Sequence, residues 1–325
     1  MQNRPKNRRA FTLIELLTVI AIIAALVGIL SVAQRKVKIV SLNLRQKAAF
    51  HAGEISLELY SKDFGGYPDS SLVSSDGAGA GPYVTGSQRV AEALFGRDDR
   101  GFHPKSKWHP SLDAAAAAPH PGANLYTDAT AKDRKTPYFE RKRAGFYTIN
   151  DLWGSSGFGS SQIYTSAGAT TGTEMSPVFT DVFTQNRVTI GTENVKVGMP
   201  ILYFKADPTK RFRVNSSNVE VDPAVALEYR QWVYNFDDNL PILQLPWLRD
   251  PTVETDGMNF QDGIRGHYKD SQDTAKAHAQ FFYETITQRA DGNFFSPHNK
   301  STFLLISAGY DGIYGTKDDL TNFDD

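Results

Sequence analysis

Residues 8–30 read RRAFTLIELLTVIAIIAALVGIL, and this stretch governs how the N-terminal part of the chain folds. From Phe11 to Leu30 it contains a single charged residue, Glu15. Twenty helical residues extend about 30 Å, which matches the hydrocarbon thickness of a bilayer. A carboxylate in such a helix costs roughly 2.5–3.5 kcal/mol at the bilayer centre, so Glu15 needs a partner. A new N-terminus at Phe11 would supply a positive amine about one helical turn away.

A short leader precedes the apolar segment and carries four cations, Arg4, Lys6, Arg8 and Arg9. This leader, followed by Phe-Thr-Leu-Ile-Glu at residues 11–15, resembles the N-terminus of type IV prepilins and type II secretion pseudopilins. The resemblance implies that a prepilin peptidase cleaves between Ala10 and Phe11, and that Phe11 is then N-methylated. It also implies that Glu15 neutralises the Phe11 amine when subunits dock. The family usually has Gly where this chain has Ala10.

Two other interpretations of the N-terminus are a secretory signal and a plain membrane anchor. A secretory signal has an apolar core of about 7–15 residues before a site of small residues. Ala21, Ala24 and Ala25 offer such a site, but the apolar run is longer than a signal core. Glu15 is unfavourable in both alternatives. Because the leader is basic, we expect a single-pass inner-membrane protein whose C-terminal domain lies in the periplasm, and in a filament or at the cell surface after assembly.

The composition excludes several classes of function. The 325 residues carry 35 basic and 36 acidic side chains, and removal of residues 1–10 leaves 31 basic residues and a net charge of −5. That balance predicts no basic surface for nucleic acid. The chain has no cysteine, so neither disulfides nor a cysteine nucleophile are available. Because nucleophile-elbow, zinc-protease and phosphate-loop motifs do not occur either, we expect no catalytic residues and no enzymatic activity.

Beyond the apolar segment, the sequence predicts that the same helix continues. Apolar residues recur at spacings of three and four, the pattern of an amphipathic helix. The stripe that they form consists of Val37, Val40, Leu44, Ala48, Ala52, Ile55 and Leu59. Gly65, Gly66 and Pro68 end the pattern. We expect one helix from Phe11 to Asp63, about 80 Å long, with its first half among neighbouring subunits and its second half buried on its own domain through this stripe.

These patterns divide the chain into regions. We expect a leader peptide at 1–10, a transmembrane and assembly helix at 11–30, the amphipathic half of the helix at 31–63, a loop-rich insertion at 64–185 and a β-rich head at 186–325. A short helix is predicted at 90–95, strands at 187–190, 195–197, 200–205, 212–214 and 302–306, and a helix at 274–289. The predicted fold class is therefore α+β, with the long helix packed on an antiparallel sheet.

The chain ends, over residues 307–325, with SAGYDGIYGTKDDLTNFDD. Asp311, Asp318 and Asp319 follow a predicted strand and alternate with glycines, which let backbone carbonyls turn inward. Calcium takes about six to eight oxygens from carboxylates and carbonyls together. The ending also resembles the C-terminal calcium loop of the type II secretion major (G-type) pseudopilin. That resemblance implies Ca²⁺ ligation by the three carboxylates and by the carbonyls of Ala308 and Ile313. An acidic surface turn is the alternative.

The two resemblances together imply a structural subunit that assembles into a periplasmic (pseudo)pilus filament for type II secretion. They imply as partners other copies of the chain in a helical filament, the prepilin peptidase, an inner-membrane assembly platform driven by a cytoplasmic ATPase, minor pseudopilins, and membrane lipid before assembly. Two alternatives stay open. One is a type IV pilus subunit for adhesion, motility or DNA uptake, and the other is a membrane-anchored binding domain that uses pilin-type export.

Overall fold

The computed structural model describes residues 13–74, 83–96, 100–103, 132–139, 145–153, 163, 177–183, 186–210, 233–243, 245, 282–283, 285–289, 295–316 and 318–323. The chain divides into two units, Met1–Leu44 and Arg45–Asp325, hereafter the N-terminal and the C-terminal unit. The boundary lies inside α1 (Leu13–Phe64), a helix of 52 residues. The predicted single helix is therefore confirmed over the described residues, whereas the five predicted regional boundaries stay predictions.

The end of α1 follows from the residues after it. Gly65 has a φ of 77°, in the left-handed region that favours glycine, and its N–H donates to the Ser61 carbonyl at 2.8 Å. This left-handed residue satisfies a carbonyl of the last helical turn and stops the helix, as the glycine pair predicted.

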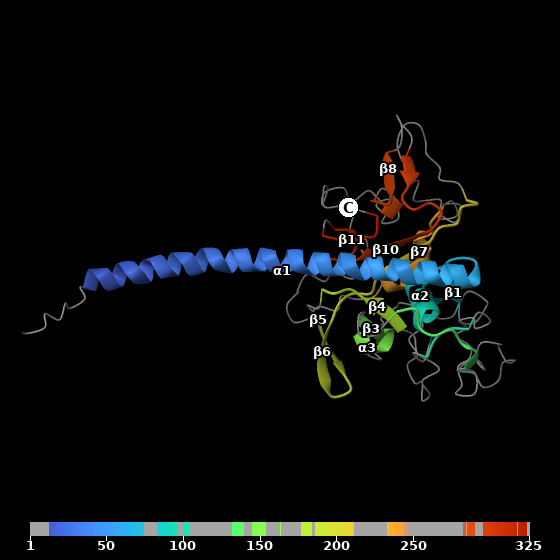
Figure 1. Cartoon of the computed structure of the whole chain (residues 1–325), viewed down its shortest axis with the longest axis horizontal. Coiled ribbons are helices and arrows are strands. Elements are labelled where there is room, and N and C mark those ends of the chain that lie inside the picture. Colours follow the sequence, from blue (N-terminus) through green and yellow to red (C-terminus); the bar gives the residue numbers. More distant parts are fainter. Residues whose placement is uncertain are drawn as a thin grey trace, which may run out of the picture. The chain divides into compact units, whose positions relative to one another are not determined.

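The C-terminal unit is an α+β assembly of short elements (Figure 1). Its strands are β1 (Val73–Ser74), β2 (Tyr83–Val84), β3 (Gly145–Thr148), β4 (Pro177–Thr180), β5 (Asn186–Ile190), β6 (Glu193–Val197), β7 (Leu202–Lys205), β8 (Thr287–Arg289), β9 (Phe295–Pro297), β10 (Phe303–Ser307) and β11 (Leu320–Thr321). Its helices are the last turns of α1, then α2 (Gly86–Phe95), α3 (Ile149–Trp153), the 3₁₀ turn η7 (Phe236–Asn239) and α4 (Leu240–Leu243). The predicted α+β class is confirmed.

One three-stranded sheet organises the core of this unit. Its order is β11-β10-β7, and both pairings are antiparallel, with Leu304 opposite Phe204 in the register. Every residue of β10 is buried, which explains its continuous apolar sequence, because both faces of the strand are covered. The remaining described strands pair in twos, β1-β2, β3-β4, β5-β6 and β8-β9, all antiparallel.

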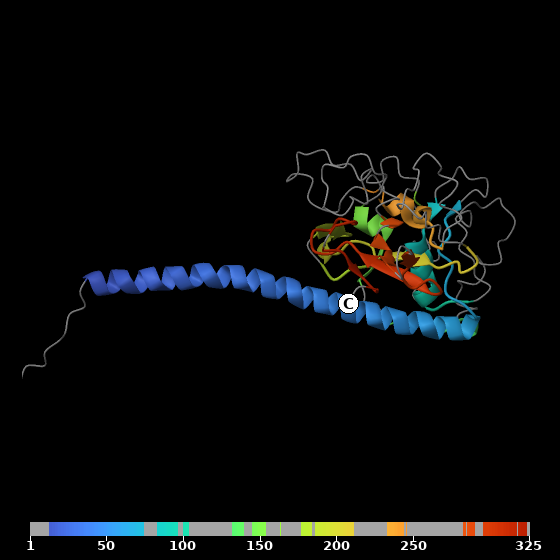
Figure 2. The ribbon, with the colours of Figure 1, turned by 90° about the horizontal axis from the view of Figure 1, so that it is seen from above.

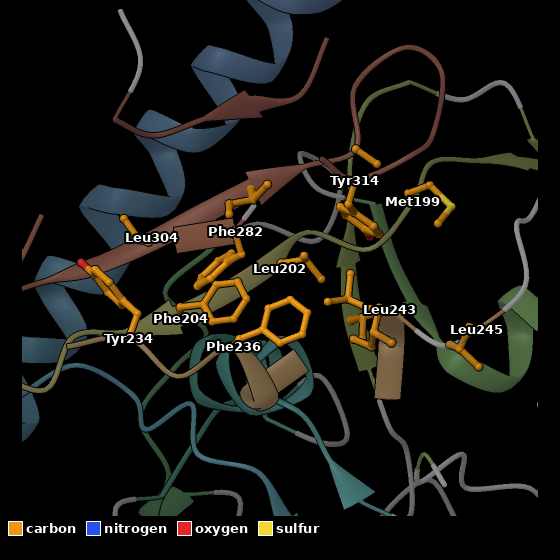
Figure 3. Close-up of a cluster of buried hydrophobic side chains, with 14 of the residues drawn as sticks. Met199, Leu202, Phe204, Tyr234, Phe236, Leu243, Leu245, Phe282, Leu304 and Tyr314 are labelled. Carbon is orange, nitrogen blue, oxygen red and sulfur yellow. The ribbon is translucent and has the colours of Figure 1, made fainter. Parts of the chain in front are cut away.

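The two faces of that sheet contribute to two different hydrophobic clusters. Alternate residues of a strand point to opposite faces, and Leu304 and Ile306 belong to one cluster whereas Phe303 and Leu305 belong to the other. In the first cluster the Phe204 and Phe282 rings lie with centroids 4.7 Å apart (Figure 3). The second cluster lies under α1 and α2, so the sheet is the layer that separates the two halves of the core.

The helix α2 is held at the centre of the C-terminal unit by its N-terminal cap. Thr85 and Gln88 form a capping box, in which the Thr85 N–H donates to the Gln88 side chain at 2.8 Å. The helix packs against β4 and β7 (Figure 2). It confirms the helix predicted at 90–95 and begins four residues earlier. It also places part of the 64–185 segment inside the folded core.

Two sequence predictions need correction. The first concerns the stripe on α1 that was predicted to be buried: its members Ile55 and Leu59 are 50% and 48% exposed. The buried face of this part of α1 carries Phe50, Leu57 and Tyr60 instead, which are at most 8% exposed. The spacing identified a helix correctly but selected the wrong face. Three further members of the stripe lie in the N-terminal unit and are also exposed, Val37 by 68%, Val40 by 57% and Leu44 by 65%.

The second correction concerns the predicted helix at 274–289. Its last residues, Thr287–Arg289, form β8 and pair with β9, so the prediction is wrong for them, and residues 274–281 and 284 lie outside the described residues. The strands predicted at 187–190, 195–197, 200–205 and 302–306 are confirmed within one or two residues at each end. The strand predicted at 212–214 lies outside the described residues.

Candidate functional site

The first candidate site is the N-terminal part of α1. Its apolar side chains are exposed within the structure, from 48% for Val19 to 80% for Leu13. Glu15 is exposed too, and its backbone carbonyl accepts a hydrogen bond from the Thr18 hydroxyl at 3.0 Å. The predicted processing residues, Ala10 and Phe11, lie outside the described residues. Among the described residues, no helix has the length and apolar window of a membrane span.

The second candidate site is the loop that joins β10 to β11. Gly309 has a φ of 66°, and a Cβ on it would lie 2.1 Å from the carbonyl oxygen of Asp318. No other residue fits there without moving the backbone, because such a contact is far inside van der Waals distance. The backbone of Gly309, near the start of the loop, therefore contacts the backbone of Asp318, near its end.

The carboxylates of this loop hold its backbone together. Asp318 accepts two hydrogen bonds, from the Asp311 N–H at 2.7 Å and from the Thr316 hydroxyl at 2.7 Å. Asp311 accepts from the Ile313 N–H at 2.8 Å. Asp319 accepts from the Gly315 N–H at 2.6 Å. The structure thus brings the three predicted carboxylates into one hydrogen-bonded loop.

The loop concentrates negative charge. Burial, reinforced by the neighbouring Asp318, raises the pKa of Asp311 to about 7. Burial also raises the pKa of Asp319 well above its usual value. The Asp319 Oδ1 atom is buried and has no hydrogen-bond partner among the residues that the structure describes. Among the described residues, no ion pair neutralises any of the three carboxylates. The buried carboxylates therefore carry negative charge that a bound proton or a cation would neutralise.

The predicted carbonyl ligands lie in the same loop. Ala308 is fully buried directly after β10, and the Ile313 carbonyl accepts from the Thr316 hydroxyl at 3.2 Å. In the described part of the chain, however, no three or more His, Asp or Glu side chains are arranged to hold a metal ion. Calcium ligation by this loop therefore stays a prediction, in which backbone oxygens would have to complete the ligand set.

Sequence reasoning missed a fourth acidic residue beside the loop. Asp181 is 3% exposed, and it accepts hydrogen bonds from the Ser307 hydroxyl at 3.0 Å and from the Phe183 N–H at 3.1 Å. Burial raises its pKa to about 7, and the charge of Asp318 contributes. No signal in the sequence identified it, because a single Asp after a strand is typical of any loop. It ties the end of β4 to the end of β10.

The comparisons with known proteins bear on the first site. Residues 5–31 match the family of the prokaryotic N-terminal methylation motif. The chain begins with a type IV prepilin-like signal. No curated protein and no solved structure matches the chain.

This prepilin-like signal offers an explanation for the exposed apolar side chains in the N-terminal part of α1. It implies a precursor that is anchored in the membrane, and a structural, pilin-like protein. The match ends at residue 31 and covers none of the C-terminal unit, so the motif says nothing about the β10–β11 loop.

Proposed function

We propose that the chain is a pilin-like subunit of a periplasmic filament, and that this filament serves type II protein secretion. The observation that carries the proposal is the coincidence of the methylation motif with an unburied apolar helix. Leu16, Leu17 and Ile20 are between 55% and 62% exposed, and all three lie within the matched motif. Exposed apolar surface of this extent marks contact with lipid or with other chains.

The proposed mechanism has two stages. In the first, residues 11–30 hold the processed subunit in the inner membrane, with the C-terminal unit in the periplasm. In the second, Glu15 pairs with the Phe11 amine of a neighbouring copy, and the helix leaves lipid for the centre of the filament. The pair matters because an uncompensated carboxylate in an apolar surrounding is costly. The prepilin peptidase, the assembly platform with its ATPase, and minor pseudopilins are the proposed partners.

The exposed stripe on the second half of α1 supports assembly through the whole helix. Ile55 and Leu59 point away from the core of the C-terminal unit although they are apolar. Packing of neighbouring helices along this stripe would remove them from water, at about 25 cal/mol per Å² of apolar surface. The proposal therefore assigns one face of α1 to its own chain and the opposite face to other subunits.

We also propose that the β10–β11 loop binds one calcium ion. Its ligands would be the carboxylates of Asp311, Asp318 and Asp319 and the carbonyls of Ala308 and Ile313. The support is the buried Asp319 Oδ1 without a partner and the raised pKa of the buried Asp311 and Asp319 carboxyls. The ion would supply positive charge and close the loop, a structural role. It would take no part in a reaction.

The first test of the filament proposal is the mass of the protein purified from its own membranes. We expect a chain that begins at N-methylated Phe11. A chain that begins after Ala25, or that retains residues 1–10, would contradict the proposal and favour a secretory signal or a plain anchor.

Deletion of the gene distinguishes secretion from a pilus. Loss of protein export with normal surface motility supports the secretion assignment. Loss of motility, adhesion or DNA uptake with normal export would assign the chain to a type IV pilus instead.

The calcium proposal is tested with Asp318→Asn, which keeps the shape of the side chain. We expect calcium to raise the melting temperature of the wild type and to have no such effect on Asp318→Asn. The exposed Asp133→Asn is the matched control and should respond like the wild type. A wild-type melting curve that is unchanged by chelator would contradict calcium binding.

A further inference from the structure

A second acidic region of the C-terminal unit encloses a cavity. The cavity has a volume of about 330 Å³ and lies among three segments that are far apart in the sequence. These are the segment after α1, the turn after β7 and the segment that leads into η7. Its lining includes six residues with charged or amide side chains, Asp69, Lys205, Asp207, Lys210, Asn235 and Asp238. It shares no residue with the β10–β11 loop.

Hydrogen bonds between the three segments hold the walls of the cavity in place. The Asp207 N–H donates to the Val233 carbonyl at 2.8 Å, which joins the second segment to the third. The Lys205 N–H donates to the Ser70 hydroxyl at 3.0 Å, and that hydroxyl donates in turn to Asp238. The cavity is therefore formed before any ligand arrives, and binding requires little ordering of the protein.

The base of the cavity is a buried carboxylate. Asp238 is 3% exposed and accepts from the Ser70 hydroxyl and from the Asn235 amide, the latter at 3.1 Å. Asp69 and Pro208 at the rim are exposed. A ligand that enters from the rim therefore meets a carboxylate at the rim, that of Asp69, and another at the base, that of Asp238.

The charges on the walls have both signs. Asp69 forms an ion pair with Arg89 at 3.0 Å, and Lys210 lies 3.6 Å from Asp207. Burial by itself would raise the pKa of Asp69, but the charge of Arg89 lowers it. The ammonium group of Lys205 lowers it further. Three carboxylates oppose the binding of an anion such as phosphate, and two ammonium groups oppose the binding of a metal ion.

A neutral ligand with several hydroxyl groups fits these walls better than an ion does. Each hydroxyl both donates and accepts, so it pairs with a carboxylate on one side and with an ammonium or amide group on the other. Hydrogen bonds in which one partner is charged are the stronger kind. Val233, Ala206 and Pro208 add an apolar portion to the lining, against which the C–H face of a sugar ring packs.

We propose that this cavity binds one neutral saccharide unit. Its hydroxyls pair with Asp69 and Asp207 as acceptors and with Lys205 and Lys210 as donors. The volume is at the lower end of small-ligand pockets, about 300–1,000 Å³, so a single sugar ring is the expected size. The site goes beyond filament assembly, which it neither requires nor contradicts.

The test is saturation-transfer NMR on the full chain in lauryldimethylamine oxide, a detergent without a sugar group. The probes are the methyl glycosides of glucose, galactose, mannose and N-acetylglucosamine. We expect transfer to the ring protons of at least one glycoside. Lys205→Met should weaken that binding about tenfold, since a hydrogen bond from a charged group is lost. Lys196→Met, at an exposed position of β6, is the matched control and should bind like the wild type.

Melting curves show whether each variant is folded. If Lys205→Met melts early, Lys210→Met at the partly exposed rim replaces it, with the same expected loss. No transfer to any of the four glycosides would overturn the proposal. Transfer that persists undiminished in both Lys205→Met and Lys210→Met would overturn it as well, because the sugar would then lie elsewhere.

Discussion

The two parts of α1 place their apolar side chains in opposite surroundings. In the N-terminal unit, the large apolar side chains that the structure describes between Leu13 and Val27, and that of Leu30, are 48–80% exposed. In the C-terminal unit, Phe50, Leu57 and Tyr60 of the same helix are at most 8% exposed and belong to a hydrophobic cluster. The difference shows that apolar residues alone do not reveal which partner covers them. The second half is partly covered by its own chain, and lipid or other copies are the proposed cover of the first half.

The largest effect that tests this difference concerns assembly. Glu15→Val should abolish filament formation, because the Phe11 amine of the neighbouring subunit then has no carboxylate to pair with. The melting temperature of the C-terminal unit should not change, since Glu15 lies in the other unit. Electron microscopy of assembled filaments and a melting curve measure the two outcomes. A fully functional Glu15→Val protein would instead support an anchored binding domain.

The next effect compares two leucines of α1 that lie two residues apart. Leu57 is 1% exposed, and Leu57→Ala should lower the free energy of unfolding by about 2–5 kcal/mol, because it leaves a cavity in the core. Leu59 is 48% exposed, and Leu59→Ala should change the same quantity by less than about 0.5 kcal/mol. Urea unfolding of both variants measures the contrast.

The surface variant Leu59→Ala, which should hardly change stability, should instead change the yield of filaments. Leu59→Ala should lower the yield at unchanged stability, because Leu59 is assigned to the face that packs on other subunits. Equal destabilisation by the two substitutions would contradict the assignment of the two faces.

A smaller effect concerns how the end of the chain holds α1. The Asn322 amide donates to Glu54 on α1 at 3.0 Å and accepts from the Leu305 N–H of β10 at 2.8 Å. Asn322→Ala should cost about 1–3 kcal/mol of unfolding free energy, because it leaves the Leu305 N–H without its partner. The exposed Asn194→Ala on β6 is the control, with little expected effect. Similar melting temperatures for both variants would show that Asn322 does not secure the helix.

The smallest effect is a pH dependence that belongs to the C-terminal unit. Burial raises the pKa of Asp238 to about 6, above its value in the unfolded chain. The folded state therefore binds the proton more tightly, and the stability that Asp238 contributes at low pH is lost as pH rises through about 6. Asp238→Asn should flatten the slope of melting temperature between about pH 4 and 6. Asp181 has a raised pKa too, so some slope should remain. An unchanged slope would contradict the role of Asp238.

The sequence predicted the positions of helices and strands better than it predicted which of their faces are buried. The strands β7 and β10 were predictable because their apolar runs are continuous, and the end of α1 was predictable because only glycine favours the backbone of Gly65. The buried face of α1 was not, since a helix that is apolar on two faces gives no indication of which one meets the sheet.

The polar contacts of the core were also beyond the sequence. Gln46 is fully buried on α1 and accepts from the Val182 N–H at 2.9 Å, a partner that only the folded chain brings near. Asp181 was missed for the same reason, because its partner Ser307 is distant in the sequence. The three carboxylates of the β10–β11 loop were found because they are close in sequence. The cavity lined by Asp69, Asp207 and Asp238 was not found, because its walls come from three distant segments.

The position of β10 in the chain has a consequence for the order of events during folding. This strand is the middle of the three-stranded sheet, yet its residues are 303–307, and its partner β7 precedes it by about a hundred residues. Contacts of such long sequence separation form slowly, because the chain must first close a large loop. The core cannot be completed until residues 303–307 are available to pair with β7. A subunit whose synthesis stops early therefore never acquires a finished domain, and folding itself separates complete subunits from incomplete ones.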